Sequence, residues 1–173
     1  MTRFMSLTGV ILLLSPGTLA QSGSPNAACG NPVAGFKVSH DKTQHPTPSP
    51  QGGNAMLYVL GSVNFAGAET VALGIDGTWV GAVNNNAYFS VPITPGQHHL
   101  CARLSGRAMM PVLLVPLIKV REVALHSLDV VPGGTYYVRV QLRLHSEFSL
   151  DLLDPDQGKL VLSHSQFSTS HLK

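Results

Sequence analysis

The sequence GIDGTWVGAVNNNAYFSVPITPGQHHLC, residues 74–101, contains two tight-turn signals among short runs rich in Val, Tyr, Phe and Ile. Asp76-Gly77 suits a two-residue hairpin, because both central positions need positive φ, which Gly adopts freely and Asp tolerates. Pro95-Gly96 suits a type II turn, in which Pro presets φ and Gly supplies the positive value. Turns at this spacing between β-rich runs predict an antiparallel sheet.

The same alternation of apolar runs and turn residues continues on both sides of this stretch. The run AMLYVLGSV, residues 55–63, is nearly all apolar, which predicts a central strand covered on both faces. Polar and apolar side chains alternate in TYYVRVQLRL, residues 135–144, as in a strand with one face in water. We expect strands over 33–39, 55–63, 69–75, 78–83, 87–92, 98–103, 120–130, 135–144 and 147–153. The predicted fold is an all-β, immunoglobulin-like or transthyretin-like antiparallel β-sandwich with one short C-terminal helix.

The helix is predicted to begin at the sequence DPDQ, residues 154–157. Asp154 can cap the free backbone N–H groups, Pro155 suits the first helical position, and Gln157 would complete a weak capping box. We expect the helix to end near Ser163, although a glycine within it, Gly158, disfavours helix formation.

The first twenty residues have the features of a secretory signal peptide. Arg3 supplies a positive charge, MSLTGVILLL at 5–14 forms an apolar core, and residues 18–20 offer small side chains before a cleavage point. An apolar core of this length is too short to span a membrane, which takes about twenty residues. We therefore expect an exported protein, periplasmic or extracellular, with no membrane span in the mature chain.

The mature chain is expected to form one domain. Residues 1–20 are the predicted leader, 21–28 a disordered lead, 29–165 a single β-sandwich domain and 166–173 a flexible tail. The two cysteines of the chain, Cys29 and Cys101, are expected to form a structural disulfide, because exported proteins favour disulfides and there is no Cys-x-x-Cys motif. In the chain-entropy account, closing a loop of roughly 70 residues stabilises the fold by about 4 kcal/mol.

Charge and composition argue against some classes of partner. The chain holds 11 Lys and Arg against 9 Asp and Glu, so nothing indicates a surface for nucleic acid. The apolar segment 106–119 contains two prolines, which exclude a long helix. It is either a loop that passes into an edge strand or an exposed patch that docks a partner.

Short motifs follow one another along the chain. They include KTQHP at 42–46, GIDG-x-WVG at 74–81, N-x-YF at 86–89, PG-x-HH-x-C at 95–101, G-x-YY at 134–137 and D-x-D-x-GK at 154–159. Their order resembles that of small exported bacterial β-sandwich proteins of a domain-of-unknown-function family, marked by a D-G-x-x-V-G hairpin followed by Y-F and P-G-x-H. Envelope domains of the P-E-G-A repeat type share the hairpin and the Pro-Gly turn. The resemblance implies an envelope location and a sandwich fold, and it transfers no catalytic residues.

Eight histidines raise the question of a metal site. His98 and His99 are adjacent in a predicted strand and should point to opposite faces, and no His-x-His or His-Glu-x-x-His motif is present. His98 is the one placed to meet His126 or His145 across strands. The simpler expectation is that His98 or His99 makes a fixed hydrogen bond near the disulfide. We expect no metal and no other cofactor.

The large aromatic residues allow two interpretations. Trp79, Tyr88 and Tyr137 either form a platform for a glycan or peptide, or pack into the core as large aromatics usually do in a sandwich. The residues predicted as possible ligand contacts are Trp79, Tyr88, His98 and His99.

Catalytic motifs are missing from the sequence. There is no Gly-x-Ser-x-Gly, phosphate loop or dinucleotide fingerprint, and Asp151, Asp154 and Asp156 lack the spacing of a calcium loop. We therefore expect a non-catalytic exported protein that acts through contacts with an unknown envelope or extracellular protein. The alternative is a small-ligand or metal-binding module that uses exposed histidine and aromatic residues.

Overall fold

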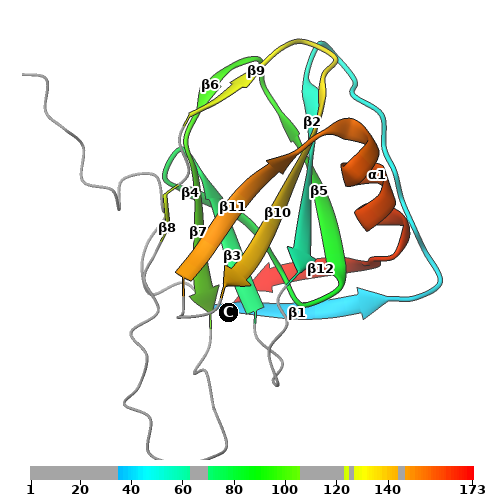
Figure 1. The fold of residues 1–173 in the computed structure, drawn as a ribbon, viewed down its shortest axis with the longest axis vertical. Coiled ribbons are helices and arrows are strands. Elements are labelled where there is room, and N and C mark those ends of the chain that lie inside the picture. Colours follow the sequence, from blue (N-terminus) through cyan, green and yellow to red (C-terminus); the bar gives the residue numbers. More distant parts are fainter. Residues whose placement is uncertain (1–34, 63–69, 106–122, 125–126, 144–146) are drawn as a thin grey trace, which may run out of the picture.

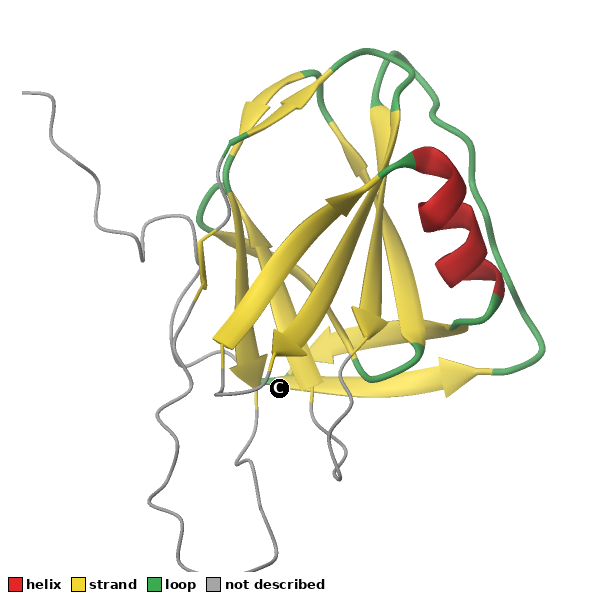
Figure 2. Ribbon diagram, viewed as in Figure 1, coloured by secondary structure: helices red, strands yellow, loops and turns green. Residues whose placement is uncertain are grey.

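The computed structural model describes residues 35–62, 70–105, 123–124, 127–143 and 147–173. Strands dominate this part of the chain, with one helix among them near the C-terminus (Figure 2). The elements are β1 (Phe36–Asp41), β2 (Ala55–Ser62), β3 (Thr70–Ile75), β4 (Thr78–Val83), β5 (Ala87–Ile93), β6 (Gly96–His98), β7 (Leu100–Ser105), β8 (Val123–Ala124), β9 (Leu128–Val130), β10 (Thr135–Arg143), β11 (Glu147–Leu153), α1 (Pro155–Ser163) and β12 (Gln166–Leu172). The predicted all-β sandwich with one short helix is confirmed.

Two main sheets form the sandwich. The larger sheet has the strand order β1-β12-β5-β2-β10-β11 and the smaller has β4-β3-β7-β8, while β6 and β9 pair separately (Figure 1). Most neighbouring strands are antiparallel, as expected, but β2 pairs with β10 and β5 pairs with β12 in parallel. These parallel pairs join strands that are far apart in the chain, so the local hairpin signals could not reveal them.

The main core lies between the two sheets, and strands of both contribute to it, among them β2, β3, β5 and β10. Leu57 and Val59 of β2 belong to this core, whereas Tyr58 and Leu60 lie in a second cluster on the other face of the larger sheet. Residues 55–60 are all buried. The prediction of a central strand covered on both faces is therefore confirmed.

Helix α1 covers the outer face of the larger sheet, and it begins and ends where the sequence predicts. The Asp154 carboxylate caps it by accepting the backbone N–H groups of Asp156 and Gln157, each at 3.0 Å. Gly158 is buried against the sheet, and a Cβ at this position would overlap the ring of Tyr137. The glycine that disfavours the helix in isolation is thus the residue that lets the helix pack closely on the sheet.

The C-terminal strand corrects one prediction. Residues 166–173 are not a flexible tail, because residues 166–172 form β12, which pairs with β1 along its length and with the start of β5. The buried Ser168 hydroxyl donates to the backbone O of Tyr88 at 3.1 Å, and Ser170 Oγ accepts the backbone N–H of Ala82 at 2.9 Å. The strand is mostly polar and is stabilised by pairing and by these bonds, so hydrophobic periodicity could not identify it.

The β1–β12 pair also contacts the smaller sheet. Phe36 of β1 packs with Ala72 and Ala82 on the outer face of that sheet, and Trp79 lies partly buried beside them. The rings of Phe36 and Trp79 meet edge to face, with their centroids 6.4 Å apart. Because β1 and β12 run across the bottom of the sandwich in Figure 1, they connect the two layers at that end.

Several predicted features lie outside the described residues, namely the leader at 1–20, the lead at 21–28, Cys29 and the segment 106–119. Cys101 is fully buried on β7, and its disulfide with Cys29 stays a prediction. The described part of the chain contains no helix with the length and apolar character of a membrane span.

Gly158→Ala should destabilise the protein even though alanine favours helices. Overpacking at a filled site typically costs about 1–3 kcal/mol, whereas the change from Gly to Ala gains only about 1 kcal/mol in a helix. We expect a net loss of about 1–2 kcal/mol in urea unfolding. Gly35→Ala is the control, because its Cβ would lie 3.8 Å from its nearest neighbour, the Lys173 side chain. Equal stability of the two variants would contradict the close packing of α1.

Candidate functional site

The turn between β3 and β4 supplies an acid that the sequence did not assign to a site. Asp76 and Gly77 have φ values of 49° and 80°, which confirms the predicted hairpin turn. Strand β3 pairs with β7 so that Ile75 lies opposite Leu100. Asp76 therefore lies beside His99, one of the predicted site residues.

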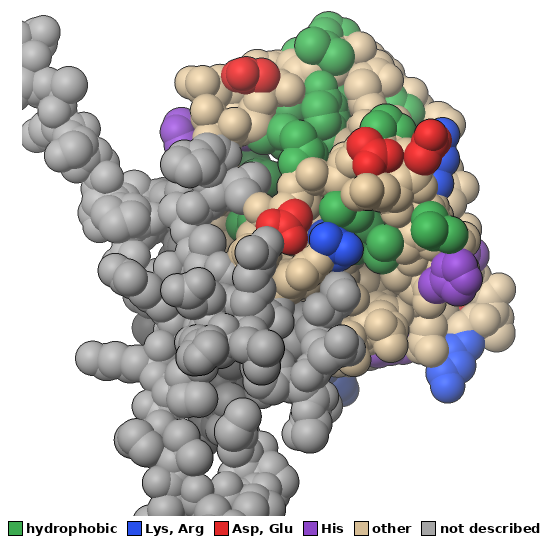
Figure 3. Space-filling model, in the orientation of Figure 1, with side chains coloured by type: hydrophobic (Ala, Val, Ile, Leu, Met, Phe, Trp, Pro, Cys, Tyr) green, Lys and Arg blue, Asp and Glu red, His purple; other side chains and the backbone are tan. Residues whose placement is uncertain are grey.

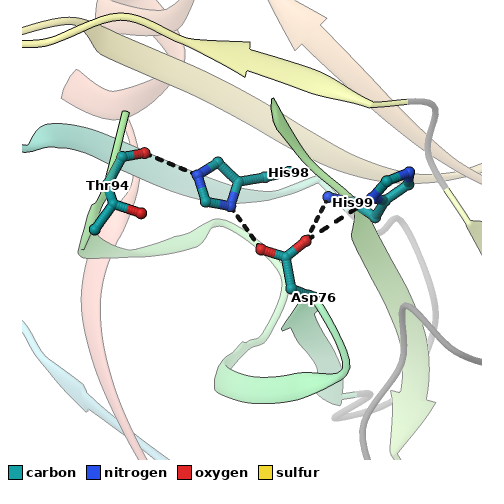
Figure 4. Close-up of polar contacts among 4 residues, drawn as sticks. All are labelled: Asp76, Thr94, His98 and His99. Carbon is teal, nitrogen blue, oxygen red and sulfur yellow. Dashed lines mark hydrogen bonds and ion pairs between the residues drawn. The ribbon is translucent and has the colours of Figure 1, made fainter. Parts of the chain in front are cut away.

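His98 lies at the end of β6, and its side chain is only 11% exposed. Its Nδ1 is 2.6 Å from Asp76 Oδ2, and its Nε2 is 2.8 Å from the backbone O of Thr94 (Figure 4). A carboxylate and a carbonyl only accept hydrogen bonds, so both ring nitrogens must carry a proton for the two bonds to form together. The geometry therefore selects the imidazolium form of His98.

His99 contacts the same carboxylate mainly through its backbone. Its N–H donates to Asp76 Oδ1 at 2.8 Å, and its backbone O accepts the N–H of Asp76 at 2.9 Å. The His99 side chain is 60% exposed, with its Nδ1 3.9 Å from Asp76 Oδ1. The prediction that the two histidines share one strand is wrong, because β6 ends at His98 and β7 begins at Leu100. The chain changes sheets at His99, where Asp76 anchors its backbone.

The charges of Asp76 and His98 support each other. Burial opposes the charge on His98, but the hydrogen bonds to Asp76 and Thr94 outweigh it and raise the pKa of His98. Burial likewise disfavours the Asp76 carboxylate, yet the backbone N–H of His99 and the contacts with His98 lower the pKa of Asp76. Opposite shifts of this kind are what an ion pair produces, so both groups stay charged over a wider pH range.

The hydrogen bonds of this network occupy both ring nitrogens of His98. A histidine that acts as a general base needs an unprotonated nitrogen facing its substrate, whereas both nitrogens of His98 are engaged. No three His, Cys, Asp or Glu side chains lie together as a metal-binding group among the residues that the structure describes. His126 and His145, the suggested partners of His98 across strands, lie outside those residues.

Trp79 and Tyr88 do not join the histidines. Trp79 lies on the outer face of the smaller sheet, where the Arg103 guanidinium is 5.0 Å from its ring centroid. Tyr88 is fully buried on the outer face of the larger sheet. Strands β4 and β5 follow one another in the chain but belong to different sheets, so these aromatic residues separate. Of the four predicted ligand contacts, the structure brings together His98 and His99.

A row of three tyrosines crosses the outer face of the larger sheet on the neighbouring strands β5, β2 and β10. Ring centroids are 6.5 Å apart between Tyr88 and Tyr58, and 5.2 Å apart between Tyr58 and Tyr137. The connector between β1 and β2 passes over this row. Tyr88 Oη donates to the backbone O of Pro46 at 3.1 Å, and Tyr58 Oη donates to that of Pro48 at 2.8 Å. The two hydroxyls thus fasten the connector to the sheet.

A pocket of about 330 Å³ opens between this connector, the sheet and helix α1. Figure 1 shows the connector running beside α1 along one side of the molecule. The residues that line the pocket with polar groups include Thr47, Ser49, Tyr58, Thr135, Tyr137 and Lys159. None of these was predicted as a ligand contact, although Tyr137 belonged to the proposed aromatic platform.

The sites escaped prediction for two physical reasons. Asp76 is fully explained as a turn residue, and only the pairing of β3 with β7 places it beside the histidines. The pocket combines a loop, two strands and a helix that are distant in the chain.

Comparison with models of protein families finds no match, and comparison with curated proteins finds none either. The resemblance to the exported β-sandwich family therefore stays a prediction.

Asp76→Asn should destabilise the protein most at mildly acidic pH. Asn tolerates the turn conformation but lacks the charge that pairs with His98. The contribution of protonated His98 to the free energy of unfolding is fully present below the unfolded pKa of about 6.5. This contribution is lost as the pH rises through the raised pKa of His98 in the folded protein. The contribution of ionised Asp76 to the free energy of unfolding is present above the unfolded pKa of about 3.9. This contribution is lost as the pH falls through the lowered pKa of Asp76 in the folded protein.

Urea unfolding at a series of pH values measures this dependence. We expect Asp76→Asn to lower the free energy of unfolding most, by about 1–2 kcal/mol, between about pH 4 and pH 6.5, and to lower it less at higher pH. The partial exposure of Asp76 keeps the loss near the lower value. His99→Ala is the control, because its backbone bonds to Asp76 remain. A loss of the same size at every pH would contradict the ion pair.

Proposed function

We propose that this protein is an exported, non-catalytic β-sandwich that works through contact with another protein of the envelope or the extracellular space. The signal peptide predicted at residues 1–20 supports export. The engagement of both ring nitrogens supports a structural use of the His98–Asp76 pair. The absence of a catalytic motif in the sequence agrees with a role in binding.

The observation that carries the proposal is an apolar patch at the β11 edge, formed by the exposed Val131 and Leu152 and the half-buried Tyr136. Strand β11 is the last strand in the order of the larger sheet. Leu152 pairs with Val138, whose side chain lies in the main core, and directly opposite residues share a face. Leu152 therefore faces the core side of the sheet, yet it is 54% exposed.

The other two residues extend this β11 patch. Tyr136 precedes Val138 by two positions, so its side chain lies on the same face. The Tyr136 hydroxyl accepts the backbone N–H of Val131 at 2.8 Å, and Val131 is 59% exposed. Figure 3 shows hydrophobic side chains at the surface on the side that carries β10 and β11. Exposed apolar groups beside a sheet edge are typical of surfaces that take a protein partner.

Binding of a small ligand is the second candidate function. The pocket between the connector, the sheet and α1 favours it, because this pocket gathers several polar groups in one place. The surface around Trp79 and His99 supports it less, since Trp79 packs with Phe36 on the outer face of the smaller sheet and His99 contacts Asp76.

Leu152→Asp should reduce the contact with the partner without unfolding the protein, because exposed substitutions usually change stability by less than about 0.5 kcal/mol. Chemical cross-linking of intact cells, followed by capture of the tagged protein, measures the contact. We expect a discrete adduct with the wild type and a loss of about tenfold with Leu152→Asp, as for a central contact residue. Leu172→Asp on β12 is the matched control, since Leu172 is 59% exposed.

Equal adduct yields from Leu152→Asp and Leu172→Asp would contradict a contact through the β11 patch. Turnover of a substrate by the purified protein would contradict the non-catalytic role, whatever the adduct yields are.

A further inference from the structure

Tyr137 differs from the other two tyrosines of its row. Tyr88 and Tyr58 donate to the carbonyls of Pro46 and Pro48, two positions apart in the connector. The Tyr137 hydroxyl has no hydrogen-bond partner among the described residues. The residue as a whole is only 6% exposed, but its hydroxyl is not a buried unpaired atom and reaches the solvent in the pocket that Tyr137 lines. A tyrosine that buries its ring and keeps its hydroxyl in contact with water presents that hydroxyl to a ligand.

The ring of Tyr137 is held in place by its neighbours. Tyr58 stacks on it with an angle of 17° between the rings, and Gly158 lies so close that a Cβ would overlap ring atoms. Burial raises the pKa of Tyr137, and burial together with Tyr137 raises the pKa of Tyr58, so the phenols stay protonated at neutral pH. A fixed, protonated hydroxyl can bind a ligand without losing much conformational entropy.

One lysine and several hydroxyl groups line the pocket. Lys159 of α1 lines it, and none of the described residues that line it is acidic. Asp156 lies outside the pocket lining, and its Oδ1 is 4.0 Å from Lys159 Nζ, with both side chains mostly exposed. This distance leaves the ammonium group able to meet a second anion. Thr47, Ser49 and Thr135 add exposed hydroxyls around the pocket.

We propose that this pocket binds a sugar acid of monosaccharide size. Its carboxylate pairs with Lys159, the Tyr137 hydroxyl donates to the same ligand, and the ligand hydroxyls bond the threonine and serine side chains. The volume of about 330 Å³ lies at the small end of ligand pockets, which suits a single sugar ring. The pocket shares no residue with the β11 patch, so the proposal of sugar-acid binding is independent of the proposed contact with a protein partner.

Isothermal titration calorimetry of the purified protein with glucuronate, glucose and acetate tests the proposal. We expect glucuronate to bind most tightly, because glucose lacks the charge and acetate lacks the hydroxyls. Lys159→Met should weaken glucuronate binding about fivefold, as expected for an exposed ion pair, and should leave glucose binding unchanged. Lys37→Met on β1 is the matched control, since Lys37 is an exposed lysine away from the pocket lining.

Tyr137→Phe separates a binding role from a structural one. This variant should also weaken glucuronate binding, while its urea midpoint stays unchanged because the hydroxyl bonds no described residue. The proposal is overturned if glucuronate does not bind at millimolar concentration. It is also overturned if acetate binds equally well, which indicates a general anion contact, or if both pocket variants keep the wild-type affinity for glucuronate.

Discussion

The Asp76 carboxylate fixes the part of the sandwich where the chain changes sheets. One of its oxygens pairs with the imidazolium of His98, and the other accepts the backbone N–H of His99. The backbone O of Thr94 accepts a hydrogen bond from the Nε2–H of His98. The β3–β4 turn, the segment after β5 and the β6–β7 junction are thereby joined through one buried ring. This connection lets β6 pair with β9 while β7, only one residue later, pairs with β3. The contacts of His98 and of the His99 backbone thus hold the chain at the point where it passes from β6 to β7.

The outer faces of the two sheets are covered in different ways. This difference explains why the pocket proposed to bind a sugar acid lies on the larger sheet. On the smaller sheet, Phe36 from the β1–β12 pair closes over alanines and leaves little room. On the larger sheet, the tyrosine row carries a proline-rich connector and α1 packs beside it through Gly158. The pocket lies between the connector, the larger sheet and α1. The β11 patch lies at the edge of the larger sheet, where Leu152 is exposed although its partner Val138 belongs to the main core.

Features with local causes could be predicted from the sequence. The Asp-Gly hairpin, the buried strand at 55–60 and the helix that begins at Asp154 each depend on residues within a few positions. Features with distant causes could not. Strand β12 is polar and exists through its pairing with β1, and the role of Asp76 depends on the register between β3 and β7. The sequence left Tyr88 and Trp79 between a ligand platform and the core. Tyr88 is buried in one cluster and Trp79 lies partly buried beside another, and only the sheet order shows that these clusters are different.

The protonation state of His98 tests the structural role of the Asp76 network most directly. Nitrogen-15 NMR of the histidine rings, recorded through a pH titration, reports whether each ring nitrogen carries a proton. The bonds to Asp76 and Thr94 require both nitrogens of His98 to be protonated, and the pKa of His98 should lie above the ordinary value of a histidine. A neutral His98 ring with one bare nitrogen at a pH near that ordinary value would contradict the account and would leave a base available for chemistry.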